Sequence, residues 1–291
     1  MVRYSNIHKI HPALAAAVQY VPPKVRTEDF RVTELTRPAL MTYLEMIHDD
    51  KIVVDVGERG DLLDGVSVHE ALARANISDA LQEENLTMEI AGVTVGGRPD
   101  WYKDGIISDF KRTKVASMFR PTRTEYVGQL NFYAVLLRSY GFPVLGVEEV
   151  PIFKDWNKAI AETQRDYPRA FSVRRKVELW TPGKATEAMI SRIKAHQEAR
   201  AGNPTLCTPE ERWAQPDNFA VMAPKKKRSL AVFGSDTARG GGIDEAEALV
   251  AAALPGLGLS VETRQGDSYV RCRKWCSVAP FCPQFANAAK R

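Results

Sequence analysis

The alternation of apolar and polar positions predicts a chain of short strands and amphipathic helices. Apolar residues from Leu40 to Ile47 recur at three- and four-residue spacing, which predicts a helix that begins at Pro38. By the same reasoning we expect helices over residues 67–76, 125–139 and 182–200, and strands over residues 30–33, 93–102, 106–111, 144–153 and 174–180. The expected fold is therefore α/β, with a mixed sheet and flanking helices.

The strongest local signal is a hairpin. Asp104-Gly105 stands between two strand-like segments, and this dipeptide is typical of a two-residue hairpin turn. If these two residues form the turn, Asp100 lies directly opposite Asp109 on the neighbouring strand. Lys111 is two residues beyond Asp109, so both side chains emerge on the same face of that strand.

The chain divides into four predicted segments. Residues 1–28 are expected to form an irregular N-terminal arm, and residues 29–205 the main α/β core. Ala201-Gly202-Asn203-Pro204 marks the end of that core. Residues 206–271 predict a small subdomain in the order strand, strand, helix, strand. A cysteine-rich segment, residues 272–291, follows it.

Composition places the chain among ordinary globular proteins. Of its 291 residues 44% are hydrophobic and 26% charged, and 40 basic against 36 acidic residues give a net charge of +4. No apolar run approaches the roughly 20 residues that a membrane span requires. The first thirty residues hold no apolar stretch typical of a signal peptide, so a cytoplasmic location is expected, in the host cytoplasm if the gene is a phage gene.

The two opposed carboxylates predict a metal site. Directly opposed side chains on paired strands have Cβ atoms about 5 Å apart, where two like charges destabilise each other unless something compensates. A divalent cation such as Mg²⁺ held by Asp100 and Asp109 would compensate them, and the Lys111 ammonium beside it could steady a water or a phosphate charge. On spacing alone, an exposed hairpin with scattered charges is an equal alternative.

Pro99-Asp100 followed by Asp109-Phe110-Lys111 resembles the signature of the PD-(D/E)XK nucleases. Three further features in the same order are similar to the RecB/AddB-like members of that superfamily. They are His69 on a predicted helix, Glu84 before the first strand of the hairpin region, and Gln129-x3-Tyr133 on the following helix. Glu83 and Glu89 compete with Glu84 for its position.

The resemblance implies a fold and an activity. It implies a restriction-endonuclease-like core and cleavage of DNA phosphodiesters that depends on Mg²⁺ or Mn²⁺. It also implies His69, Asp100 and Asp109 as metal ligands and Lys111 as a catalytic residue, with Glu84, Gln129 and Tyr133 completing the site. Linear duplex or single-stranded DNA is then the expected partner, and a phage-type exonuclease in recombination, replication or repair is the expected role.

A basic segment follows the hairpin. From Lys111 to Thr124 there are five basic residues and no acidic one. Beside a metal site, four of them are expected to contact DNA phosphates: Arg112, Lys114, Arg120 and Arg123. A second basic run, residues 225–228, suits a hairpin tip as well as a DNA contact.

The four cysteines predict a second metal site. Three crowd the C-terminus as Cys272-x3-Cys276-x5-Cys282, and Cys207 stands alone. Some RecB- and AddB-like nucleases carry a four-cysteine 4Fe-4S cluster, and the resemblance implies one here, with Zn²⁺ and free thiols as alternatives. Two departures from that pattern are the three-residue first gap and the position of Cys207 after the nuclease motifs.

Two other functions compete with the nuclease. One is a nucleic-acid-binding module with a degenerate nuclease site, and the other is an interaction protein whose fold is stabilised by zinc. The complete set of His69, Asp100, Asp109 and Lys111 favours an enzyme, because a degenerate site need not keep all four.

Overall fold

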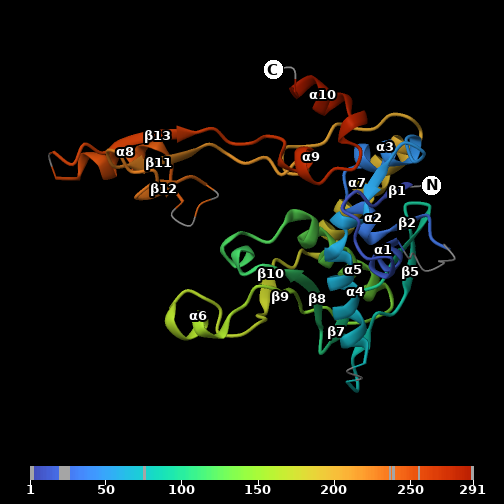
Figure 1. The fold of residues 1–291 in the computed structure, drawn as a ribbon. Coiled ribbons are helices and arrows are strands. Elements are labelled where there is room, and N and C mark those ends of the chain that lie inside the picture. The colour runs from blue at the N-terminus through green and yellow to red at the C-terminus, as the bar shows by residue number, and fades with distance from the viewer. Residues whose placement is uncertain are drawn as a thin grey trace. The chain divides into compact units, whose positions relative to one another are not determined.

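A computed structural model of the protein describes residues 3–19, 27–74, 77–235, 237, 240–254 and 256–289 (Figure 1). The chain forms two compact units. The first consists of residues up to Ser117 together with Thr122–Leu206, and the second of Met118–Pro121 and Cys207–Arg291. The chain combines helices with sheets whose strands pair both in parallel and antiparallel, which confirms the predicted α/β class.

A five-stranded sheet organises the first unit. Its strand order is β10-β9-β8-β7-β4, and the long central strands β8 and β9 pair in parallel while the others pair antiparallel (Figure 1). The bounds are β4 Leu81–Gln82, β7 Trp101–Lys103, β8 Ile106–Thr113, β9 Gly146–Phe153 and β10 Arg175–Val177.

The predicted hairpin is confirmed. Trp101 pairs with Ser108 and Lys103 with Ile106, which is the register that places Asp100 opposite Asp109. Asp104 and Gly105 both have positive φ, at 50° and 80°, as a type I′ turn requires.

The strand predicted over residues 93–102 is wrong, because the structure divides it between two sheets. β6 (Val93–Gly97) belongs to a three-stranded sheet of order β2-β6-β5, with β2 Phe30–Arg31 and β5 Leu86–Ile90. The chain then leaves this sheet through Arg98 to Asp100 and enters the larger one as β7. Pro99 has no N–H to donate, which favours a break at this point.

Helix α5 (Thr124–Ser139) forms the centre of the hydrophobic core. Most of its residues from Gly128 to Leu137 are buried, and they pack with Ile107 of β8 and Val147 of β9. Helix α7 (Pro182–Arg200) packs against α5, and helix α3 (Ala39–Ile47) packs against α7. The predicted helix from Pro38 is confirmed, although Ile47 is exposed rather than buried.

The N-terminal segment is more regular than predicted. β1 (Arg3–Ser5) pairs in parallel with β3 (Val53–Asp55), and α1 (Pro12–Gln19) packs on Val56. Helix α4, which carries His69, spans Gly60–Ala73 and so begins well before the predicted start at Ser67. The predicted end at Asn76 lies outside the described residues.

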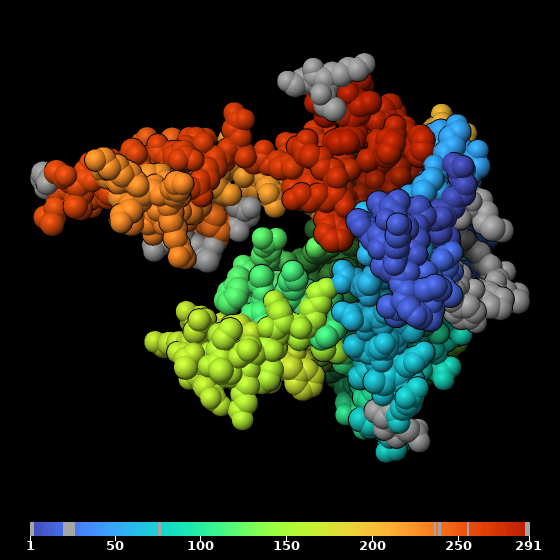
Figure 2. All heavy atoms as spheres, viewed as in Figure 1, coloured from blue at the N-terminus to red at the C-terminus, as the bar shows by residue number. Residues whose placement is uncertain are grey.

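The other elements of the first unit are short. They are α2 Val32–Leu35, η1 Val56–Glu58, the part of η2 (Val115–Phe119) up to Ser117, and α6 Lys158–Thr163. The segment around α6, yellow-green in Figure 2, projects from the surface of this unit. Prediction from sequence missed α6.

The second unit contains the predicted strand, strand, helix, strand sequence. β11 (Asn218–Met222) lies between β12 (Ala231–Phe233) and β13 (Ser260–Arg264), and α8 (Ile243–Ala251) packs on this sheet through Ala246. The chain continues through α9 Val270–Lys274, η3 Ala279–Phe281 and α10 Pro283–Ala289. In the part of the chain that is described, no helix has the length and apolar character needed to cross a membrane.

Candidate metal centre and catalytic cleft

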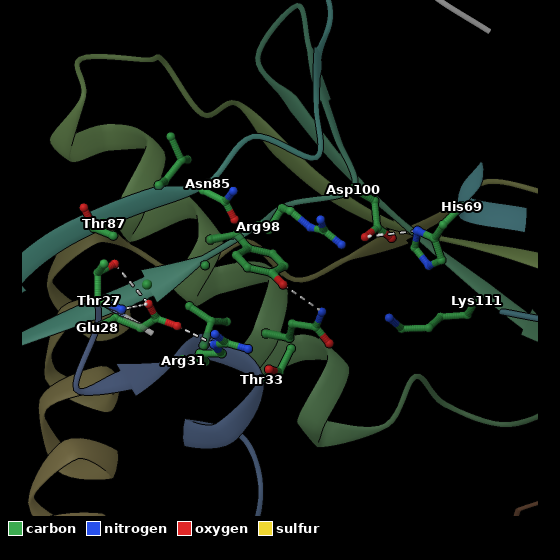
Figure 3. A pocket seen from close by; sticks show the side chains of 16 residues that line it. Thr27, Glu28, Arg31, Thr33, His69, Asn85, Thr87, Arg98, Asp100 and Lys111 are labelled. Carbon is green, nitrogen blue, oxygen red and sulfur yellow. Dashed lines mark hydrogen bonds and ion pairs between the residues drawn. The ribbon is translucent and has the colours of Figure 1, made fainter. Parts of the chain in front are cut away.

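A polar cleft of about 600 Å³ opens in the first unit. It lies where the chain passes from β6 to β7, and side chains from α4, β8 and α5 also line it. Figure 3 shows His69, Asp100 and Lys111 gathered at one end, and Glu28 and Arg31 at the other. The split of the predicted strand therefore creates the site, because it places Asp100 between two sheets.

Three side chains at one end of the cleft could share a metal ion. His69, Glu83 and Asp100 each offer a ligand atom, and these atoms lie within 4.8 Å of one another. His69 Nδ1 lies 2.8 Å from Glu83 Oε1 and 3.8 Å from Asp100 Oδ1. Two carboxylates and one imidazole form a donor set that suits Mn²⁺ or Mg²⁺.

Asp100 is held by the strand opposite it. The Phe110 backbone N–H donates a hydrogen bond of 2.8 Å to Asp100 Oδ2, while Asp100 Oδ1 faces His69. Phe110 lies between Asp109 and Lys111 in β8, so this bond fixes Asp100 beside both of them.

Asp109 and Lys111 form a close ion pair on the face of β8 that points to the cleft. Asp109 Oδ2 lies 2.6 Å from Lys111 Nζ, and the Asp109 side chain is 2% exposed. The Gln129 amide donates to Asp109 Oδ1 at 3.1 Å and also to the Tyr133 hydroxyl at 3.2 Å. The predicted residues Asp109, Lys111, Gln129 and Tyr133 thus belong to one connected network.

Burial changes the pKa values of this network. Burial, followed by the negative charge of Asp100, raises the pKa of Asp109 to about 6 although Lys111 opposes the shift. Burial also raises the pKa of Asp100. For Lys111, burial alone would lower the pKa, but the Asp109 and Asp100 carboxylates outweigh it and the pKa is raised. The lysine therefore stays an ammonium.

The structure groups a different glutamate from the one that sequence favoured. Glu83 contacts His69, and its other oxygen lies 3.3 Å from the Arg98 guanidinium. Glu84 is exposed, and it does not belong to the trio that the described residues form. Asp109, predicted as a ligand, also lies outside the trio and is bound by Lys111 and Gln129.

Two residues of the site were not selected from the sequence. Tyr126, on the first turn of α5, has its ring centre 5.0 Å from Lys111 Nζ. Arg98 lines the cleft between β6 and β7 and pairs with Glu83. The position of Tyr126 three residues before Gln129 is a usable signal, because residues at that spacing lie on one side of a helix.

The predicted basic segment is anchored at Ser117 and Thr122. Glu149, the register neighbour of Asp109, accepts a hydrogen bond of 2.9 Å from Thr122, and Arg175 donates to the Ser117 carbonyl at 2.8 Å. Within the segment Lys114, Arg120 and Arg123 are exposed, and Arg120 belongs to the second unit. Arg112 lies 3.9 Å from Asp64 of α4.

All four cysteines belong to the second unit, and none of them forms a disulfide. The Gln284 side chain hydrogen bonds to both the N–H and the carbonyl of Cys207, which ties this cysteine to α10. Burial, then Glu211 and the other three cysteines, raise the pKa of Cys207 to about 12. Among the described residues, no three cysteine sulfurs lie within 4.8 Å of one another.

The comparisons with known proteins give little information. No family model matches the chain, and no curated protein matches it. One solved structure, that of SSO0001, is similar over 62% of this chain and 83% of the other, with 17% identity and a TM-score of 0.43. This likeness is too weak to carry an argument about fold or function.

Proposed function

We propose that the protein is a metal-dependent deoxyribonuclease with a PD-(D/E)XK-type core, and that it acts as an exonuclease on linear DNA. One observation carries the proposal. A trio of potential metal ligands (His69, Glu83 and Asp100) lies beside a buried carboxylate–ammonium pair (Asp109 and Lys111). His69, Asp100 and Lys111 line a single open cleft. Metal ligands with an adjacent fixed cation are what phosphodiester hydrolysis needs.

Mg²⁺ or Mn²⁺ is the cofactor that fits these residues. Burial raises the pKa of both Asp100 and Asp109 although the Lys111 ammonium opposes the shift, so a bound cation would stabilise these two carboxylates in their charged form. His69, Glu83 and Asp100 would hold the ion, and its charge would also offset that of Asp109. Such an ion supplies a Lewis acid and an activated water when it is bound.

The residues of the chain have distinct roles in this proposal. The Lys111 ammonium would lie where negative charge develops on the phosphate, and Asp109 fixes the position of that ammonium. Gln129 in turn holds the Asp109 carboxylate, and its position on α5 links the network to the rigid core. Arg112, Lys114, Arg120 and Arg123 would contact phosphates along the DNA, and His69 and Tyr133 would orient their neighbours.

A nuclease assay tests the proposal. The protein is incubated with Mg²⁺ or Mn²⁺ and with linear duplex, single-stranded or circular DNA, beside an Asp109→Asn variant as the control. Cleavage of linear DNA alone by the unchanged protein supports the exonuclease. Cleavage of circles indicates an endonuclease, and an equally active Asp109→Asn variant would contradict the assigned site.

We also propose that Cys207, Cys272, Cys276 and Cys282 bind a 4Fe-4S cluster that stabilises the second unit. Gln284 brings Cys207 to the C-terminal segment, which supports its membership of the set. Zn²⁺ held by the same four thiolates is the alternative, and metal analysis distinguishes the two.

A further inference from the structure

Lys111 and Arg123 flank the same aromatic ring at the edge of the cleft. Lys111 Nζ lies 5.0 Å from the centre of the Tyr126 ring, and the Arg123 guanidinium carbon lies 5.9 Å from it. The two positive charges are therefore no further apart than the sum of these distances, about 11 Å. We propose that Tyr126 is a positioning residue that spaces Lys111 and Arg123 to hold two neighbouring phosphates of one DNA strand.

The local structure explains why this spacing is fixed. Arg123 immediately precedes α5, and Tyr126 is on the first turn, where its N–H bonds to the Arg123 carbonyl at 2.9 Å. Lys111 comes from β8 and is held by the buried Asp109. A helix and a strand that belong to the same core thus present the two cations, and the half-buried ring lies against both of them.

Tyr126 is suited to this role because its ring attracts cations without neutralising them. The face of an aromatic ring binds an ammonium or a guanidinium through its quadrupole and carries no net charge. A carboxylate in the same position would hold the cations as well, but it would compete with phosphate. The ring therefore positions both cations without adding a negative charge that would repel a polyanion.

The spacing predicts which part of the substrate is bound. Lys111 lies at the metal end of the cleft and would contact the phosphate that is cleaved. Arg123 would then contact a flanking phosphate of the same strand, since phosphates of one strand follow each other at about 3.4 Å along a duplex axis. A substrate with only one phosphodiester lacks this second contact, so we expect it to be bound weakly.

This inference rests on the proposed nuclease, and the experiment separates the two. The substrate is an oligonucleotide in which a neutral methylphosphonate replaces one phosphate next to the cleaved one. The replacement is made on one side of the cleaved phosphate in one substrate and on the other side in a second substrate. We expect this replacement to raise KM about tenfold or more for the unchanged protein, with a small effect on kcat, since it removes a charge-assisted contact. For Arg123→Ala the same replacement should change KM less than about twofold, because the contact that it removes is already absent.

Further variants identify the part played by Tyr126. Tyr126→Phe keeps the ring and should keep the methylphosphonate effect, whereas Tyr126→Leu should lose it as Arg123→Ala does. Lys114→Ala removes an exposed charge of the same segment and should keep the full effect. A methylphosphonate penalty that persists in Arg123→Ala, or that Lys114→Ala removes equally, overturns the inference.

Binding measured with Ca²⁺ in place of Mg²⁺ provides the separate readout. If the unchanged protein cuts no DNA, the proposed nuclease is wrong, but the same comparison of methylphosphonate and variant can be made on the dissociation constant. A methylphosphonate effect on binding that depends on Arg123 would still support the phosphate contact. No binding of the oligonucleotide, or an effect independent of Arg123, would reject it.

Discussion

The Phe110 backbone N–H donates a 2.8 Å hydrogen bond to Asp100 Oδ2 across the hairpin. This bond occupies one carboxylate oxygen and leaves the other, Oδ1, facing His69 at 3.8 Å. Asp100 can therefore offer Oδ1 to a metal ion, together with His69 and Glu83. The identity of the second carboxylate ligand is accordingly the first point to test.

Glu83→Gln should weaken Mn²⁺ binding by about tenfold or more, because it removes a charged ligand from the trio. Glu84→Gln is a matched control at the next position, and its side chain is exposed, so its Mn²⁺ affinity should stay close to that of the unchanged protein. Calorimetric titration with Mn²⁺ measures both without requiring activity. A larger effect at Glu84 than at Glu83 would mean that the sequence-based choice was right.

Lys111→Ala should lower both turnover and stability. Asp109 is buried and would lose the ammonium 2.6 Å away, and an uncompensated buried carboxylate costs about 3 kcal/mol. Lys111→Ala combined with Asp109→Asn should regain most of that stability, since no buried charge remains, but should stay inactive. Urea unfolding and single-turnover cleavage measure the two effects. Recovery of activity in the double variant would contradict the role of Lys111.

Gly97→Ala should destabilise the first unit by about 1–3 kcal/mol, because overpacking forces neighbours to move. A Cβ at this position would lie 2.6 Å from Leu136 Cδ1 and 2.9 Å from Tyr133 Cε1, which are atoms of α5. Gly183→Ala is the control, since a Cβ there would meet no atom within 4 Å and the position is helical. We expect the urea midpoint to fall for Gly97→Ala and to stay or rise for Gly183→Ala.

The buried His196 should make stability depend on pH. Burial, with a contribution from Arg192, lowers its pKa from 6.5 to about 4. The unfolded chain therefore binds more protons between these values, so stability is complete above pH 6.5 and falls as the pH drops towards 4, by up to roughly 3 kcal/mol. His196→Gln should flatten this dependence in the same pH range. An identical slope in the variant would show that His196 does not cause it.

Removal of any cluster ligand should destabilise the second unit to a similar extent. We expect iron and sulfide of about four each per chain after anaerobic purification, and a brown colour. Cys207→Ser and Cys276→Ser should both lose the iron and lower the melting temperature. A content of one zinc ion per chain would indicate a zinc-ribbon site instead of the cluster. A Cys207→Ser variant with unchanged stability would show that Cys207 is not a ligand.

Local signals explain what could be predicted from the sequence. The hairpin and its register follow from Asp104-Gly105, because a two-residue turn fixes the pairing of the strands around it. Strand alternation then places Asp109 and Lys111 on one face, whereas Gln129 and Tyr133 follow from the resemblance of Gln129-x3-Tyr133 to the motif of RecB-like nucleases. These residues meet in the structure because both elements carrying them are long and regular.

Tertiary structure decides the rest. Glu83 has a φ of 48°, and this left-handed backbone directs its side chain in a way that strand alternation does not predict. The resemblance to RecB-like nucleases favours Glu84 for this position instead. The division of residues 93–102 between two sheets depends on pairing with β2 and β4, which are distant in sequence. The same is true of β1, whose partner β3 lies some fifty residues away.

The two-residue turn at Asp104 and Gly105 also decides which face of β8 carries the chemistry. Side chains alternate along a strand, so a shift of one residue would exchange the two faces. Asp109 and Lys111 would turn towards the side now occupied by Ser108 and Phe110, and a phenyl ring would enter the cleft. The protein should therefore not tolerate a single-residue insertion in this turn, so that the length of the turn constrains the site as strictly as the identity of its carboxylates.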